Sequence, residues 1–179
     1  TGFSSFAYSL DGYTWTSVSG TSNLLVYVYD IKYNGSIWVA CGVKADNATG
    51  VRIYYSIDGF TWTACTESLF TSIDDYINTL CWNGTLWLAG GYSSTVSMIY
   101  SYDGINWTGI TGDDNIFDTG ETRSIRWNGY YFLATGTVDY STYSYGISNS
   151  GINWGLDGAL TNPMNALPQG MEWNGSVWI

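Results

Sequence analysis

Hydrophobic and aromatic residues lie along this chain in short runs, and most runs are bounded by an Asn-Gly or Asp-Gly pair. The runs are rich in Tyr, Trp, Ile, Val and Thr, which are the residues that favour β-strands. No apolar run reaches the roughly 18 residues that a membrane-spanning helix needs. The pattern therefore predicts an all-β protein of short strands without a membrane span.

One turn motif, Ser-x-Asp-Gly-x-x-Trp, recurs at intervals of 45 to 47 residues, and in a fourth copy Ser150 replaces the aspartate. We predict that the aspartate accepts backbone amide hydrogen bonds within its own turn, that the glycine supplies a positive φ, and that the tryptophan caps the hairpin. The motif is therefore predicted to be structural. Its residues are Ser9, Asp11, Gly12 and Trp15, then Ser56, Asp58, Gly59 and Trp62, then Ser101, Asp103, Gly104 and Trp107.

An Asn-Gly turn alternates with the first motif and recurs every 45 to 49 residues. Asn-Gly and Asp-Gly are the favoured central pairs of two-residue type I′ hairpins, in which both residues have positive φ. We therefore predict positive φ at both members of each pair. The Asn-Gly pairs are Asn34 and Gly35, Asn83 and Gly84, Asn128 and Gly129, and Asn174 and Gly175.

One period thus holds two hairpins, which predicts a four-stranded unit; in one copy the strands are INTLCW, LWLAGGY, SMIYSY and INWTGI. Repeated four-stranded units of this length are typical of β-propeller blades. We predict an all-β propeller made of one domain, residues 1–179, with three complete blades and two partial ones. The predicted ranges are 1–23 (partial), 24–68, 69–115, 116–160 and 161–179 (partial).

The two partial blades allow three arrangements. The ends can meet in a composite fourth blade and close a four-bladed ring, or the chain can be a fragment of a larger propeller. In the third arrangement a neighbouring chain completes an unpaired blade edge, which produces an oligomer or a filament. A strand that stops at Ile179 favours the fragment.

The amino-acid composition excludes some classes of function for this chain. The chain is 18% aromatic and 11% charged, and its ten tryptophans all lie in the repeat register, which assigns them to packing between strands. A net charge of −10 with five basic residues excludes a nucleic-acid-binding surface. Cys41, Cys65 and Cys81 lack metal-ligand spacing and are interpreted as small buried thiols.

Few residues outside the turns suggest a site. The acidic loop 112–121 offers carboxylates that suit Ca²⁺, but their spacing matches no calcium-binding motif, so a solvated loop is favoured. The sequence indicates no other cofactor. Tyr140, Tyr143 and Tyr145 can stack on sugars, although half-buried strand positions are favoured. The calcium candidates are Asp113, Asp114 and Asp118, and the glycosylation candidates, for a protein made in a eukaryotic secretory route, are Asn47 and Asn106.

The motif Ser9-x-Asp11-Gly12-x-x-Trp15 and its copies resemble the Asp-box, or bacterial neuraminidase repeat, of β-propellers in sialidases, sortilin-type receptors and glycan-active proteins. The usual box has one more residue between Asp and Gly. The alternation of YSYDGINW with WNGSVW also resembles repeat proteins of large DNA viruses, phages and environmental bacteria. The resemblance implies a propeller in which the box lies on a turn away from the central cavity, without a catalytic role.

Sialidase activity in that family requires three arginines around the substrate carboxylate, a Tyr–Glu pair and an acidic residue. This chain has only Arg52, Arg123 and Arg126, and it lacks the family's Phe-Arg-Ile-Pro sequence. We therefore expect a non-catalytic structural, adhesion or recognition propeller on an extracellular or virion surface, with a protein or glycan surface ligand. The alternative is a glycan-binding or sialidase-like glycoside hydrolase propeller whose active site lies in blades outside this chain.

Overall fold

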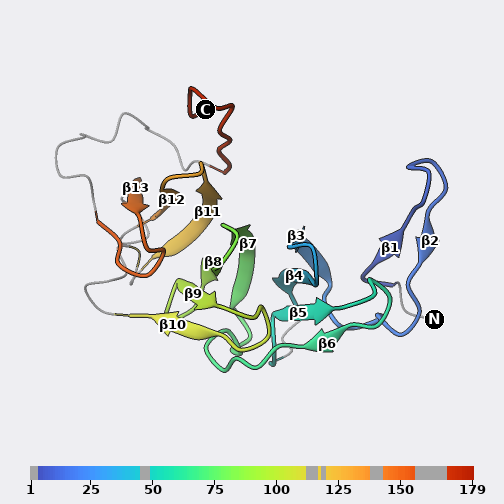
Figure 1. Ribbon diagram of the computed structural model, residues 1–179. Helices are drawn as coiled ribbons and strands as arrows, with labels where there is room; N and C mark the ends of the chain where they lie inside the picture. The colour runs from blue at the N-terminus through green and yellow to red at the C-terminus, as the bar shows by residue number, and fades with distance from the viewer. Residues whose placement is uncertain (1–3, 45–48, 112–116, 118–119, 138–142, 156–168) are drawn as a thin grey trace.

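The computed structural model describes residues 4–44, 49–111, 117, 120–137, 143–155 and 169–179. Every regular element among these residues is a β-strand (Figure 1). The prediction of an all-β fold is therefore confirmed. The strands are β1 (Ala7–Tyr8), β2 (Thr16–Ser17), β3 (Tyr27–Tyr33), β4 (Trp38–Val43), β5 (Ile53–Ser56), β6 (Thr63–Ala64), β7 (Tyr76–Trp82), β8 (Trp87–Tyr92), β9 (Met98–Ser101), β10 (Thr108–Ile110), β11 (Glu121–Trp127), β12 (Phe132–Thr137) and β13 (Tyr143–Ser148).

The strands form four antiparallel sheets, and in each sheet neighbouring strands are consecutive in the chain: β1–β2, β3–β6, β7–β10 and β11–β13. The three larger sheets fall within 24–68, 69–115 and 116–160, and Gly155 extends the third through a bridge to Ile147. Near the C-terminus, Trp173 and Trp178 form a bridge across the last Asn-Gly turn. The described residues form a series of sheets and no closed ring (Figure 1).

The first hairpin of each larger sheet carries a β-bulge at the same repeat position, for example between Val28 and Asp30. A bulge bends its strand and increases the local twist. Gly42 and Gly91 lie opposite these bulges, where an added Cβ would collide with the carbonyl oxygens of Tyr27 and Tyr76. Glycine is therefore required in strands β4 and β8.

Apolar side chains fill the space between successive sheets. Val39, Ile77 and Trp87 belong to the cluster between β3–β6 and β7–β10. A second cluster, which includes Leu88 and Phe132, joins β7–β10 to β11–β13. A third cluster joins the hairpin β1–β2 to β3–β6. Each sheet is therefore stabilised mainly by its neighbours in sequence.

The first strands of the three larger sheets, β3, β7 and β11, lie side by side (Figure 1). The amide of Leu80 donates to Asp30 Oδ2 at 2.9 Å, and the amide of Ile125 donates to Thr79 Oγ1 at 3.2 Å. These bonds join equivalent repeat positions, because a side chain of one first strand accepts from the backbone of the next. They bring residues of different repeats into one place.

The tryptophans of the Ser-x-Asp-Gly-x-x-Trp turns differ strongly in burial. Trp107 and Trp154 are buried, whereas Trp15 is 65% exposed. Trp62 is half-buried and stacks on Phe6 with ring centroids 4.2 Å apart. The prediction that all ten tryptophans pack between strands is therefore wrong for Trp15, because no sheet of the described residues covers the outer side of β1–β2.

Candidate binding site

Each Asp-Gly turn is closed by its own side chains. In the third copy Asp103 Oδ1 accepts from the amides of Ile105 and Asn106, both at 2.8 Å. Ser101 Oγ donates to Asp103 Oδ1 and accepts from the amide of Gly104 at 2.8 Å. The same bonds are formed by Ser9, Asp11 and Gly12 and by Ser56, Asp58 and Gly59.

These bonds determine the ionisation of the aspartates. The backbone amides of the turn lower the pKa of Asp11 and Asp58 to about 2, because they stabilise the carboxylate. Burial raises the pKa of Asp103, but the bonds from Asn106 and Ile105 outweigh it and the net shift is downward. The turn aspartates are therefore ionised and occupied as acceptors.

The tryptophans cap three of these turns. The Nε1 atoms of Trp62 and Trp107 donate to the carbonyl oxygens of Gly59 and Gly104 at 3.1 and 3.2 Å. Trp154 makes the equivalent bond of 2.9 Å to Gly151 in the copy that lacks the aspartate. The glycines of the Asp-Gly turns have φ between 75° and 78°. These residues have local structural roles.

The Asn-Gly turns differ from the predicted type I′ hairpins. Among the described residues Asn23 is the only non-glycine residue with positive φ, so Asn34, the other turn asparagines and the turn aspartates have negative φ. The closing strand pair is Tyr33 with Trp38, which leaves four residues in the turn instead of two. Asn34 Oδ1 accepts from the amides of Ser36 and Ile37 at 2.9 Å, and the side chain thereby takes the place of a backbone acceptor.

The same geometry recurs at the other Asn-Gly turns, where the asparagine Oδ1 accepts two amide bonds of 2.7–2.9 Å. The glycines have φ between 97° and 104°, as predicted for the second residue of the pair. The prediction of positive φ was therefore right for glycine and wrong for asparagine and aspartate. The residues concerned are Asn83 and Gly84, Asn128 and Gly129, and Asn174 and Gly175.

A pocket of about 460 Å³ lies where the first strands meet, and we call it the first-strand pocket. It is lined by Tyr29 of β3, Tyr76 and Asn78 of β7, Arg123 of β11 and Gln169. Four of these residues, all except Tyr76, stand five positions before the asparagine of an Asn-Gly turn. One repeat position thus supplies a tyrosine, an asparagine, an arginine and a glutamine to a single pocket.

A charge-balanced hydrogen-bond network extends from the pocket to Glu121. Arg123 Nη2 lies 2.6 Å from Glu121 Oε2, and Asn78 Nδ2 donates to Glu121 Oε1 at 3.0 Å. The Tyr76 hydroxyl also bonds this carboxylate. Two buried atoms of the network, Asn78 Oδ1 and Arg123 Nε, have no hydrogen-bond partner among the described residues.

Burial governs the titration of this network. Burial raises the pKa of Glu121, although bonds from Tyr76, Arg123 and Asn78 oppose the shift. Burial and the bond to Glu121 raise the pKa of Tyr76, so its hydroxyl is protonated at neutral pH. Tyr76 is therefore a hydrogen-bond donor in this pocket.

The other two arginines lie elsewhere. Arg52 is fully buried, and its guanidinium donates to backbone carbonyls, including Asp75 at 2.8 Å and Ser72 at 2.6 Å. Arg126 donates to the carbonyl of Ile125 at 2.9 Å and lies 3.6 Å from the Glu172 carboxylate. The structure therefore brings one arginine to the pocket, where sialidases require three.

The remaining site candidates from the sequence add no described residue to the first-strand pocket. Asn106 is exposed and donates through Nδ2 to Asp103 Oδ2 at 2.7 Å. Tyr143 and Tyr145 lie on β13, and Tyr145 is outside the residues that line the first-strand pocket. No group of three or more residues suited to a metal ion is found in the described part of the chain. The candidates Asp113, Asp114, Asp118, Asn47 and Tyr140 lie outside the described residues.

The cysteines match the interpretation as buried thiols. All three are free and buried, and burial raises the pKa of Cys65 and Cys81 to about 12. In the segments that the structure describes, no helix is long and apolar enough to cross a membrane.

Sequence reasoning identified the turn residues but missed Tyr29, Tyr76 and Asn78, and it mentioned Glu121 only as part of an acidic loop. The available signal was the varied polar residue five positions before each Asn-Gly turn, in an otherwise uniform repeat. No family model matches the sequence, and no curated protein matches it either.

Proposed function

We propose that this chain is a propeller-type recognition module that binds a saccharide in the first-strand pocket without cleaving it. The observation that carries the proposal is the contrast between the turns and the pocket. The turn residues repeat because each hairpin needs the same acceptors, whereas the pocket position varies among polar residues of different chemistry. Variation of this kind in a uniform scaffold supports a binding role, because function resides in particular sites of a fold.

The chemistry of the pocket favours a neutral, hydroxyl-rich ligand. Tyr29 and Tyr76 offer aromatic surface, with ring centroids 6.4 Å apart. Asn78 and Gln169 supply amide donors and acceptors, and Arg123 is neutralised by Glu121. A charged ligand of either sign gains little electrostatic attraction from the balanced Arg123–Glu121 pair. Sugar hydroxyls, by contrast, can both donate and accept hydrogen bonds.

Two features support the propeller part of the proposal. The sheets β3–β6 and β7–β10 have four consecutive antiparallel strands, and their first strands lie together, as blades require. The resemblance of the turns to the Asp-box supports the same architecture and a place on an extracellular or virion surface.

Isothermal titration calorimetry with glucose, galactose, mannose and N-acetylglucosamine tests the proposed function. At least one of these sugars should bind, and Tyr29→Ala should weaken its binding at least tenfold. Tyr102→Ala is the matched control, because Tyr102 is exposed and lies outside the pocket. Absence of binding by all four sugars, or equal loss in both variants, would contradict the proposal.

Glycoside cleavage is a second candidate, favoured by the contact between Tyr76 and Glu121. The single arginine in the pocket and the protonated Tyr76 hydroxyl speak against it. Fluorogenic umbelliferyl glycosides, including the sialoside, should therefore show no release above background. Release that disappears in Tyr76→Phe and Glu121→Gln would instead establish cleavage.

A further inference from the structure

A β-bulge supplies one residue of each first strand to the first-strand pocket. The pairing register of each first hairpin skips a single residue, which is Tyr29 in β3, Asn78 in β7 and Arg123 in β11. All three of these residues line the pocket. Because the extra residue of a bulge is left unpaired, its side chain can take a direction that a regular strand would not give it. The bulge residues therefore determine the chemistry of the pocket.

Among the described first strands, charge reaches the pocket from β11 alone. The residue two positions before the bulge residue is Tyr27 in β3, Tyr76 in β7 and Glu121 in β11. The first two repeats thus have uncharged residues at both positions, whereas the third has a carboxylate and a guanidinium. An ion pair at one repeat of a uniform scaffold indicates that this pair helps to select the ligand.

The Glu121 carboxylate holds three of the five residues that line the pocket. Its Oε2 atom lies 2.6 Å from Arg123 Nη2, and its Oε1 atom accepts from Asn78 Nδ2 at 3.0 Å. The Tyr76 hydroxyl bonds the same carboxylate. The Glu121 side chain is 9% exposed, and the Arg123 side chain is 28% exposed. The anion of the pair is therefore covered, while part of the cation remains accessible.

Arg123 is the charged partner of Glu121 among the described residues. The other arginine of β11, Arg126, lies near the Glu172 carboxylate instead. Tyrosine hydroxyls and thiols are protonated in acid and at neutral pH, so they add no charge here. The titratable residues of the strands packed against β11 are Tyr76 and Cys81 of β7 and Tyr92 of β8, with none in β12, and Tyr29 of β3 lies across the pocket.

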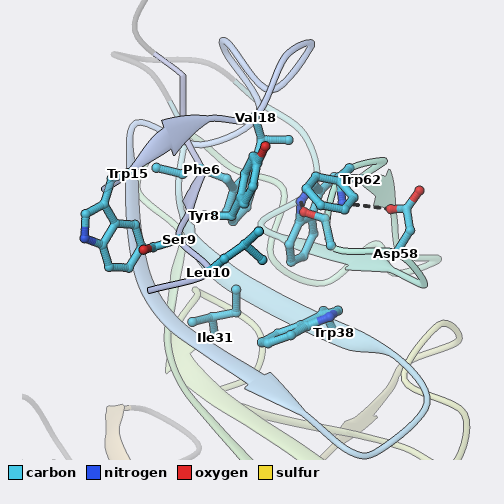
Figure 2. Close-up of a pocket in the computed structure, with 13 residues that line it drawn as sticks. Phe6, Tyr8, Ser9, Leu10, Trp15, Val18, Ile31, Trp38, Asp58 and Trp62 are labelled. Atoms are coloured by element: carbon cyan, nitrogen blue, oxygen red, sulfur yellow. Dashed lines mark hydrogen bonds between the residues drawn. The ribbon is translucent and has the colours of Figure 1, made fainter. Parts of the chain in front are cut away.

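The pocket of about 390 Å³ between the hairpin β1–β2 and the sheet β3–β6 offers a contrast (Figure 2). Its lining is largely apolar and includes Phe6, Trp38 and Trp62. Its carboxylate, Asp58, accepts the amide of Phe60 at 2.8 Å within its own turn, and no basic residue is among the described residues that line this pocket. Of these two pockets, the first-strand pocket is thus the one in which neutralising a carboxylate leaves a cation unbalanced.

We propose, on the basis of the saccharide function proposed above, that Glu121 determines the charge of the ligand and that protonation of Glu121 converts the pocket from neutral to acidic saccharides. While Glu121 is ionised it balances Arg123, and a neutral sugar binds. When Glu121 is protonated, the Arg123 guanidinium is unbalanced and attracts a sulfate or carboxylate group of the ligand. Glu121 is a positioning residue, because it acts on the ligand through Arg123.

The burial of Glu121 places this change in mildly acidic solution. Burial raises the pKa of Glu121 above the ordinary value of 4.5, because the covered carboxylate loses hydration. Bonds from Tyr76, Arg123 and Asn78 oppose the shift without reversing it. Since the pKa lies above 4.5, more than half of the Glu121 carboxylates are protonated at pH 4.5. The affinity for an acidic ligand should therefore rise as the pH falls from 7 to 4.5.

Isothermal titration calorimetry with glucose, glucose 6-sulfate and inorganic sulfate, at constant ionic strength, tests this proposal. The two sugars differ in one sulfate group, whose charge is the same at pH 7 and at pH 4.5. Inorganic sulfate measures the unbalanced charge of Arg123 without a sugar. For the wild type, the affinity for glucose 6-sulfate should rise at least tenfold from pH 7 to pH 4.5, while that for glucose should not rise. Glu121→Gln should show the higher affinity already at pH 7, with no further rise in acid.

Glu172→Gln is the matched control, because Glu172 lies near Arg126, outside the pocket lining, and its loss changes the net charge by the same amount. This variant should bind like the wild type at both pH values. The double variant Glu121→Gln, Arg123→Gln should lose the gain, because the cation is removed. Near-UV circular dichroism verifies that each variant is folded. If Glu121→Gln is unfolded, the pH dependence of the wild type and its absence in Arg123→Gln decide the question.

A wild type whose affinity for glucose 6-sulfate and sulfate is the same at both pH values would overturn the proposal. A folded Glu121→Gln variant that binds them no better than the wild type at pH 7 would do the same. Equal gains in Glu121→Gln and Glu172→Gln would also overturn it, because net charge would then be responsible. If no sugar binds, but inorganic sulfate binds Glu121→Gln and not the wild type at pH 7, the saccharide function fails and the role of Glu121 is supported.

Discussion

At the scale of single residues, short side-chain acceptors hold the hairpins of this chain. Asp103 and Asn34 use one oxygen to accept two backbone amides, and the following glycine has positive φ. The side chain thus satisfies turn amides that the strands leave unpaired. Ser150 does the same in the fourth copy through the amides of Ile152 and Asn153, which explains why that turn persists without a carboxylate.

Two substitutions of Asp103 should therefore separate the stability that its hydrogen-bond acceptor contributes from the stability that its charge contributes. Asp103→Ala removes both amide bonds and should lower the free energy of unfolding by about 1 kcal/mol. Asp103→Asn keeps an Oδ1 acceptor and should cost less than half as much. Urea unfolding followed by tryptophan fluorescence measures both; equal losses would show that the charge matters more than the acceptor.

Acidic pH should lower the stability of the fold, because it protonates the aspartates of the same turns. The pKa values of Asp11 and Asp58 are about 2 in the folded chain, below the ordinary value of 3.8. Their stabilising contribution is therefore complete above pH 3.8 and is lost as the pH falls toward 2. In thermal melts between pH 5 and 2, the double variant Asp11→Asn, Asp58→Asn should lose less stability than the wild type. Parallel curves would contradict this assignment.

At the scale of elements, the same strand or turn has a different environment in each repeat. The first strand β3 alternates between exposed and half-buried residues, whereas β7 is mostly buried. The difference arises because β7 lies between two of the larger sheets, whereas on one side of β3 the described residues provide only the two-stranded sheet β1–β2. The repeat therefore specifies each sheet, while the neighbours specify its burial.

Substitutions of two tryptophans at the same motif position test whether the neighbouring sheets determine how much a side chain stabilises the fold. Trp107→Ala removes a buried side chain from the cluster between two sheets and should cost about 3–5 kcal/mol. Trp15→Ala, at the exposed copy, should change the stability by about 0.5 kcal/mol or less. Urea unfolding curves of the two variants give the comparison. Similar costs would mean that Trp15 is buried in solution.

At the scale of the whole molecule, stacked sheets bring residues about 45 positions apart in the sequence into the first-strand pocket. The central sheet β7–β10 contributes to both large apolar clusters. The hairpin β1–β2 contributes only Phe6, Tyr8 and Val18 to its own cluster. Stability should therefore decrease from the centre of the series toward β1–β2.

Hydrogen–deuterium exchange can measure this gradient. The amides of β7 and β8 should exchange slowest, and those of β1 and β2 fastest, at a low protein concentration. Uniform protection across all sheets would contradict the gradient.

The sequence by itself determined the hairpins of this protein. Turn dipeptides and strand-forming residues act within a few positions, so the period and the strands of β3–β10 follow from local chemistry. Even here the four-residue Asn-Gly turns differed from the predicted two-residue form, because an asparagine side chain can replace a backbone acceptor. Tertiary structure alone decided that Trp107 is buried and Trp15 exposed, and that Tyr29, Asn78 and Arg123 share a pocket. These outcomes depend on contacts between sheets, which one repeat cannot encode because they are made by its neighbours.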